Sequence, residues 1–296
     1  LKRSPCYDRM LEKGAVFGST FGWERPNWFA PPGYGLSEAE LAKPDTLLRE
    51  NHPPAAPGEK VTEKWSFRRS NYFEFVGNEC RHVHEKVGIL DMSAFSKFMV
   101  EGHDSASWLD SLLANRIPRK IGRIGLCHLL TSLGGVRSEF TVYRLAEDRF
   151  YLVSAGMLER HDWDYLTKAL PVDGRVQLRK VTSQYGVLVV AGPNSRSLLQ
   201  RLTDRDLSNE AFPWLSGQPV NIGAADAHAI RVNFVGELGW ELHHPIETQN
   251  YIFDRLFEAG EEFDLKPFGI RAMDSLRLEK SYRLIPRELS VEYAAL

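Results

Sequence analysis

Paired extended segments are the feature that most limits the folds open to this chain. The clearest pair lies near the end, where AIRVNF (229–234) is followed by VGELG and then by WELHHP (240–245). Gly236 and Gly239 separate the two segments, and glycines in such a position are typical of a tight turn. We therefore expect a β-hairpin here, with strands that run antiparallel.

The second strand of this hairpin carries a carboxylate, Glu241, beside a tryptophan. Side chains alternate along a strand, so Glu241 should share a face with His243, and Trp240 should share the other face with Leu242. Strand glutamates commonly face water, which is one interpretation of Glu241. The other is that Glu241 contacts a nitrogen-rich ring. The local pattern leaves both open.

Strand-like and helix-like segments alternate along most of the chain. Period-two alternation predicts strands, and amphipathic periodicity predicts helices. The expected strands are 95–102, 123–131, 136–145, 149–156, 176–182 and 185–192. The expected helices are 79–88, 105–115, 158–170, 194–202, 248–260 and 269–282. Because hairpins interleave with the helices, the predicted class is α+β with mostly antiparallel sheet.

The N-terminal part differs in composition from the rest. Prolines and glycines crowd FGWERPNWFAPPGYG (21–35), and both residue types interrupt helices and central strands. We expect an irregular stretch held by its aromatic side chains, followed by a linker. The predicted parts are an aromatic, proline-rich arm and linker at 1–62, a first subdomain at 63–171 and a second at 172–296.

Composition excludes several classes of protein. Lys and Arg (37) nearly balance Asp and Glu (39), so a net charge of -2 gives no electrostatic case for nucleic acid. No apolar stretch approaches the roughly 20 residues of a membrane helix. Three cysteines without a CxxC pair fit a reducing compartment and argue against a disulfide framework. We expect a cytoplasmic location, or the mitochondrial matrix in a eukaryote.

The first ten residues, LKRSPCYDRM, have neither an initiator methionine nor the composition of a leader. The expectation is that the chain is a piece of a longer polypeptide.

Common cofactor signatures do not occur in the sequence. No GxGxxG follows a strand, and there is no GxxxxGK[ST] phosphate loop. His82 and His84 are two residues apart on an expected helix and so point to different faces, which makes metal ligation by the pair unfavourable. We expect no metal site.

A second carboxylate of interest is Glu139, in GGVRSEFTV. Alternation places Glu139 on one strand face with Arg137 and Thr141. The simple interpretation is a weak ion pair between Glu139 and Arg137 on a wet sheet face. The local pattern alone favours that interpretation.

Seven blocks of the sequence, taken in order, resemble one family. They are residues 22–31, 80–102, 133–145, 191–202, 212–216, 235–245 and 271–283, which include GWERPNWFAP, LGGVRSEFTVYRL, VGELGWELHHP and RAMDSLRLEKSYR. Together they are similar to the tetrahydrofolate-binding half of dimethylglycine and sarcosine dehydrogenases. That half is itself similar to the glycine-cleavage T-protein, an aminomethyltransferase.

The resemblance implies a fold and a function. The fold would be the aminomethyltransferase folate-binding fold, with a ferredoxin-like second subdomain and without the C-terminal barrel. The module would capture the one-carbon unit from oxidative demethylation of dimethylglycine or sarcosine and form 5,10-methylenetetrahydrofolate. Its cofactor would be tetrahydrofolate, and FAD would belong to a missing N-terminal flavin oxidase domain, linked covalently or docked.

The resemblance also implies site residues. Glu139 matches an acidic residue near the reacting nitrogens and would be catalytic. Glu241 matches the carboxylate that binds the pterin ring, and Phe234 matches an aromatic residue that packs on it. Leu126 and Trp214 match other positions in the wall of the site.

Two departures from the T-protein pattern affect the folate contacts. Ala155 replaces an asparagine that contacts folate, and Met273 replaces an arginine of the late helix. Two alternatives therefore stay open. One is a stand-alone folate-dependent demethylase or methyltransferase, and the other is a non-catalytic folate-binding or docking domain. Folate-binding relatives tied to iron–sulfur maintenance carry a reactive cysteine after the late helix, where this chain has Ser281.

Overall fold

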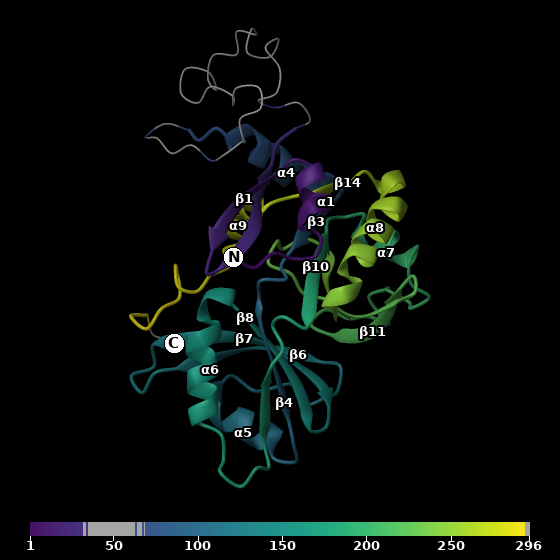
Figure 1. The fold of residues 1–296 in the computed structure, drawn as a ribbon. Helices are drawn as coiled ribbons and strands as arrows, with labels where there is room; N and C mark the ends of the chain where they lie inside the picture. The colour runs from purple at the N-terminus through teal and green to yellow at the C-terminus, as the bar shows by residue number, and fades with distance from the viewer. Residues whose placement is uncertain (32–33, 35–62, 64–66, 68, 294–296) are drawn as a thin grey trace.

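The computed structural model describes residues 1–31, 34, 63, 67 and 69–293 of the chain. Two six-stranded sheets with helices packed on them form most of the molecule, and we name them the upper and the lower sheet after their places in Figure 1. Neither sheet closes into a barrel within the described residues. The predicted α+β class with mostly antiparallel pairing is confirmed.

The lower sheet has the strand order β5-β6-β7-β8-β4-β9, with every pair antiparallel among the described strands. Its strands are β4 (Ser96–Glu101), β5 (Leu113–Ala114), β6 (Ile124–Leu130), β7 (Val136–Ala146), β8 (Arg149–Ser154) and β9 (Gln177–Lys180). Helices α5 (Ser105–Leu112) and α6 (Glu159–Lys168) pack on one face through Leu109 and Leu166.

The upper sheet has the strand order β11-β12-β13-β10-β3-β14 and is antiparallel except for β14 beside β3. Its strands are β3 (Val87–Asp91), β10 (Tyr185–Ala191), β11 (Gly217–Ile222), β12 (Ala225–Ile230), β13 (Gly239–Pro245) and β14 (Leu265–Pro267). Helices α7 (Ser195–Gln200) and α8 (Gln249–Gly260) cover one face. Helices α4 (Phe73–Glu85) and α9 (Ile270–Glu279) cover part of the other.

The lower sheet is one continuous insertion between β3 and β10 of the upper sheet. The chain crosses between the sheets at 92–95 and again at 181–184. The sheets therefore divide the chain differently from the predicted subdomains 63–171 and 172–296, because β3 joins the upper sheet and β9 the lower. Hydrophobic periodicity specifies that a segment is a strand, but strand pairing at long range selects its sheet.

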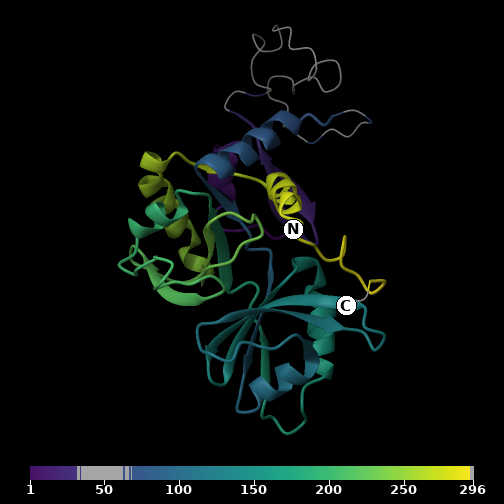
Figure 2. The same cartoon turned by 180° about the vertical axis from the view of Figure 1, so that it is seen from behind.

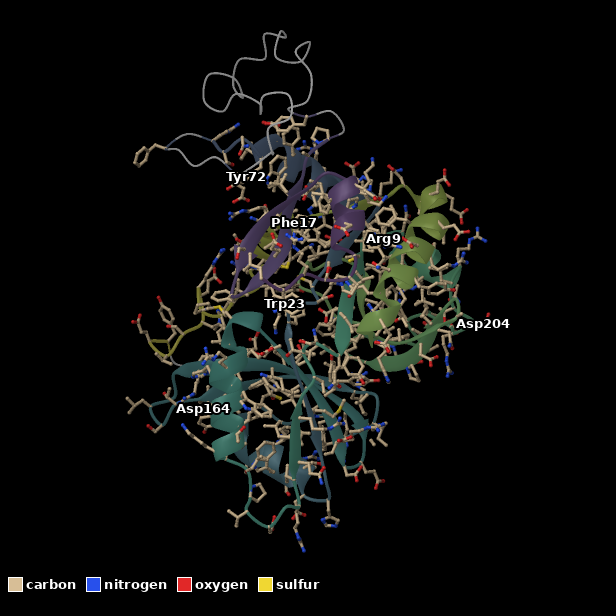
Figure 3. All side chains as sticks on the ribbon, in the orientation of Figure 1. Arg9, Phe17, Trp23, Tyr72, Asp164 and Asp204 are labelled. Atoms are coloured by element: carbon tan, nitrogen blue, oxygen red, sulfur yellow. The ribbon has the colours of Figure 1, made fainter. Side chains whose placement is uncertain are left out.

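The N-terminal residues form a small sheet instead of the predicted irregular stretch. After α1 (Tyr7–Glu12), strand β1 (Ala15–Thr20) pairs antiparallel with β2 (Trp23–Phe29). Both strands of a two-stranded sheet are edge strands, so Pro26 can occupy β2 without removing a central hydrogen bond. Arg9 of α1 forms two hydrogen bonds to Asp254 of α8, which ties this element to the upper sheet (Figure 3). The proline-rich linker that we predicted after this stretch lies outside the described residues.

Two expectations based on glycine positions, the end of a helix at Gly88 and a tight hairpin turn at Gly236 and Gly239, were wrong. Helix α4 runs from Phe73 to Glu85, and Gly88 is not its end but a buried strand residue, where an added Cβ would come within 2.6 Å of the Phe268 ring. The predicted tight hairpin has an eight-residue connection, 231–238, between β12 and β13. Glycine marks close packing as well as turns, and that ambiguity explains both errors.

The segment after α9 runs back to the lower sheet, as Figure 2 shows from behind. The backbone N–H of Val136, at the start of β7, donates to the carbonyls of Ser290 and Tyr293.

Within the described part of the chain, no helix combines the length and apolar character needed to cross a membrane.

A buried carboxylate joins three elements of the upper half. Glu79 of α4 accepts hydrogen bonds from the backbone N–H of Phe29 in β2, at 2.7 Å, and of Gly269 before α9, at 2.8 Å. Burial raises the pKa of Glu79 to about 7, although both N–H donors favour the charged form. This side chain therefore fixes the N-terminal sheet against the late helix.

We expect Glu79→Ala to lower the free energy of unfolding by about 2–4 kcal/mol, because two buried N–H groups lose their acceptor. Urea denaturation measures the change. Glu74→Ala on the exposed face of the same helix is the matched control, with an expected change within about 0.5 kcal/mol. Equal effects of the two substitutions would contradict the assigned role of Glu79.

Candidate functional site

The two sheets meet along faces that side-chain alternation defines. In the lower sheet, Phe140 and Val142 pack under α5 and α6, whereas Tyr143, Tyr151 and Val153 face the upper sheet. The cluster on that second face includes Ile230 of β12. Polar side chains on the same strand faces as this cluster therefore lie between the two sheets.

Glu241 lies on the inner face of β13, as the alternation of the strand predicted. Its neighbours Trp240 and Leu242 pack in the core under α7 and α8. Glu241 is only 7% exposed, so the interpretation that it faces water is wrong. Burial raises the pKa of Glu241 to about 8, and the positive charge of Lys97 opposes this rise.

A chain of hydrogen bonds connects Glu241 to the lower sheet. His243 Nε2 lies 3.1 Å from Glu241 Oε2, and His243 Nδ1 lies 3.2 Å from the Tyr151 hydroxyl of β8. His243 and Tyr151 are both buried. Within the described part of the chain, Glu241 Oε1 has no hydrogen-bond partner. One oxygen of a buried carboxylate is thus available to a ligand.

Lys97 of β4 is a fully buried cation at the same interface. Its Nζ donates to the carbonyl of Ser93 at 2.7 Å, and its backbone N–H donates to Thr182 Oγ1 at 3.0 Å. Burial lowers the pKa of Lys97 to about 7, and the charges of Asp91, Glu159 and Glu241 oppose this effect. The Lys97 and Glu241 side chains therefore each favour the charged form of the other.

Glu139 pairs with His128 and not with Arg137, so the predicted ion pair is wrong. His128 of β6 is the cross-strand neighbour of Glu139, and its Nε2 lies 2.9 Å from Glu139 Oε2. The β6–β7 register shifts at Arg137, and the Arg137 guanidinium lies over the ring of Tyr165 instead. A bulge of this kind redirects one side chain while its neighbours keep their alternation.

The three apolar site residues have different surroundings. Phe234, in the 231–238 connection, packs partly buried beside α4 and α9 and meets the ring of Tyr282 edge-on. Leu126 on β6 is 46% exposed and Trp214 is 63% exposed. No hydrogen bond or ion pair of the described residues joins Glu139 to Glu241, which come from different sheets.

No group of three or more His, Cys, Asp or Glu side chains that could hold a metal ion occurs among the described residues.

The chain matches the family model described as the GCVT N-terminal domain over residues 6–296. It belongs to the GCVT family. This confirms the resemblance that the seven sequence blocks indicated.

Two relatives connect this GCVT chain to amine dehydrogenases. It is 37% identical to mitochondrial dimethylglycine dehydrogenase of Mus musculus over 285 residues, which are 96% of this chain and 30% of that protein. It is 32% identical to mitochondrial sarcosine dehydrogenase of Homo sapiens over 297 residues, 96% of this chain and 32% of that protein. The chain thus spans about a third of the length of these relatives.

A solved structure confirms the fold. The glycine cleavage system aminomethyltransferase T from Bartonella henselae superposes with a TM-score of 0.74 at 22% identity, and the match covers 99% of this chain and 66% of that one. The chain therefore has the aminomethyltransferase fold and is related to dimethylglycine and sarcosine dehydrogenases.

Sequence reasoning missed Lys97, Tyr151 and the partner role of His243. A lysine in the middle of the apolar segment FSKFMV was a usable signal, because Lys97 shares its strand face with Met99. Tyr151 gave no such signal, since its partner is 92 residues away in sequence.

The buried state of Lys97 predicts a pH dependence of stability. The pKa of Lys97 is about 7 in the folded protein, whereas its ordinary value of 10.5 applies to the unfolded chain. Between these two pH values the unfolded chain binds more protons than the folded protein, so stability rises with pH there. We expect the free energy of unfolding of the wild type, relative to Lys97→Met, to grow by about 1–2 kcal/mol from about pH 8 to about pH 9.5. Urea denaturation at the two pH values measures this difference.

Lys168→Met provides the control, because Lys168 is an exposed lysine on α6. The difference in the free energy of unfolding between Lys168→Met and the wild type should not change with pH. A constant difference for Lys97→Met as well would contradict a buried lysine with a lowered pKa.

Proposed function

We propose that this chain binds tetrahydrofolate and transfers to it the one-carbon unit of an oxidised N-methylamine, giving 5,10-methylenetetrahydrofolate. The amine would be dimethylglycine or sarcosine, the substrates that name the two relatives. The observation that carries the proposal is the buried Glu241 carboxylate, one oxygen of which accepts no hydrogen bond from the described residues.

The chemistry of Glu241 fits the pterin ring of folate. The ring edge offers adjacent N–H donors, and an ionised carboxylate can accept two of them at once. His243 engages one lone pair of Glu241 Oε2, which leaves Oε1 and a second lone pair of Oε2 for such donors. A protonated carboxyl group fits less well, so ring binding would favour the charged form that Lys97 also favours.

Three apolar residues would complete the ring site. Phe234 offers an aromatic surface seven residues before Glu241, in the connection that leads into β13. Leu126 and Trp214 are large exposed apolar side chains, and such residues gain free energy when a ligand covers them. Ile124 N–H donates to the Leu215 carbonyl, so the segments that carry Leu126 and Trp214 are hydrogen-bonded to each other.

Glu139 would act at the reacting nitrogens. Bound tetrahydrofolate supplies two amine nitrogens, N5 and N10, which take up a carbon at the oxidation level of formaldehyde with loss of water. The Glu139 carboxylate would stabilise positive charge that develops there, and its hydrogen bond from His128 would hold it in place. Its side chain is 16% exposed, so solvent screens it only in part.

The one-carbon unit requires a source. We propose that a flavin oxidase domain with FAD, linked or docked, oxidises the methylamine and delivers the product to this domain. Both relatives are named as mitochondrial, and we propose the mitochondrial matrix as the location if the protein is eukaryotic.

Substitution of each carboxylate by its amide should separate binding from transfer. We expect Glu241→Gln to weaken tetrahydrofolate binding about tenfold or more, because an amide accepts through one atom only and its NH₂ faces a ring donor. We expect Glu139→Gln to leave binding nearly unchanged and to slow formation of methylenetetrahydrofolate on the order of 10²-fold. Calorimetry measures the affinity, and product assays on the intact dehydrogenase measure the transfer.

The control for both is Glu101→Gln, which removes a carboxylate that pairs with Arg179 at the edge of the lower sheet. It should change neither quantity. If Glu139→Gln transfers carbon as fast as the wild type, Glu139 is only the cross-strand partner of His128. If Glu241→Gln binds folate normally, the proposed function itself fails.

A further inference from the structure

The contact between Tyr151, His243 and Glu241 links the proposed ligand carboxylate to the opposite sheet. Tyr151 belongs to β8 of the lower sheet, and the other two residues belong to β13 of the upper sheet. The rings of Tyr151 and His243 meet edge to face, with centroids 5.4 Å apart. Both ring nitrogens of His243 are engaged, one on each side.

The surroundings define where the protons lie when Glu241 is charged. Burial lowers the pKa of His243 to about 3, so the imidazole is neutral and carries one proton. Burial also raises the pKa of Tyr151 well above its ordinary value, so its hydroxyl keeps its proton. A charged Glu241 can only accept, and therefore Nε2 carries the imidazole proton and donates to Oε2. Nδ1 then accepts from the Tyr151 hydroxyl.

We infer that His243, whose Nε2–H donates to Glu241 and whose Nδ1 accepts from Tyr151, is a positioning residue that fixes the Glu241 carboxylate for a ring with adjacent N–H donors. The inference rests on the proposed role of Glu241 in folate binding. With Oε2 engaged by His243, the carboxylate cannot rotate freely, and Oε1 keeps its lone pairs for the ligand. A preorganised acceptor binds more tightly than one that must be ordered during binding.

The same interface contains a matched pair that lacks the carboxylate. The Tyr143 hydroxyl lies 3.4 Å from His228 Nδ1, and the two rings also meet edge to face. Tyr143 belongs to β7 and His228 to β12, so this pair joins the two sheets as well. Among the described residues, no carboxylate is hydrogen-bonded to His228.

The two tyrosines allow a direct comparison. Tyr151→Phe and Tyr143→Phe each remove one buried hydroxyl and one contact between the sheets. Calorimetry on the intact protein measures the affinity for tetrahydrofolate, and ¹⁵N NMR of the imidazole nitrogens reports the tautomer of His243. We expect Tyr151→Phe to weaken binding about fivefold, because His243 then loses the partner that orients its ring, while the charged Glu241 keeps the proton on Nε2. Tyr143→Phe should bind as the wild type does.

Substitution of His243 tests the same arrangement from its centre. His243→Gln keeps a donor for Glu241 and an acceptor for Tyr151, and we expect it to retain most of the affinity. His243→Leu removes both and should weaken binding about tenfold. Thermal denaturation of each variant identifies any that fails to fold, and in that case the tyrosine pair alone decides the question.

The outcomes separate the inference from the proposed function. Loss of binding in Glu241→Gln together with equal affinities for Tyr151→Phe and Tyr143→Phe would overturn the positioning role and leave the proposed function intact. Unchanged binding in Glu241→Gln would overturn both. A wild-type His243 that carries its proton on Nδ1 in the folate complex would overturn the inference whatever the affinities are.

Discussion

The structure depends on the double crossing of the chain between its two sheets. The segments 92–95 and 181–184 lead into and out of the lower sheet, and each is hydrogen-bonded to the sheet beside it. Met92 N–H donates to the Val187 carbonyl, and Val181 N–H donates to the Lys97 carbonyl. Because the lower sheet is inserted into the upper one, two chain segments join the sheets, and hydrogen bonds between the inner faces, such as Tyr151–His243 and Ile124–Leu215, connect them further. The two inner faces are therefore held in a fixed relation.

This fixed relation explains why polar residues can be buried between the sheets. An isolated charge in such a place is costly, and Lys97 and Glu241 are tolerated because each opposes the effect of burial on the other. His243 and Tyr151 form a hydrogen bond with each other across the interface. A hydrophobic interface of the same size would be easier to bury but could not present an acceptor to a ligand. The arrangement thus gives up some stability and keeps a buried hydrogen-bond acceptor between the sheets.

The sequence was sufficient for the class of fold and for the alternation of side chains along β7 and β13, because both follow from local periodicity. It also indicated the family, through blocks spread over nearly the whole chain. It was insufficient to assign β3 to the upper sheet and β9 to the lower sheet. It also could not predict the strand at Trp23–Phe29 or the partner of Glu139, since each depends on contacts between distant residues. Tyr151 could not be predicted for the same reason, because its burial between two sheets depends on packing, whereas Lys97 carries a local signal as a lysine within an apolar strand segment.

We propose that a folate ring binds at the Glu241 carboxylate between the two sheets. A crystal structure of the protein with bound tetrahydrofolate tests this most directly. We expect ring nitrogens within hydrogen-bond distance of Glu241, on the order of 3 Å, with Phe234 against the ring and the His243–Glu241 contact retained. A ring bound elsewhere, such as in the hollow beside Arg201, Thr203 and Asn221, with Glu241 free of contact, would contradict it.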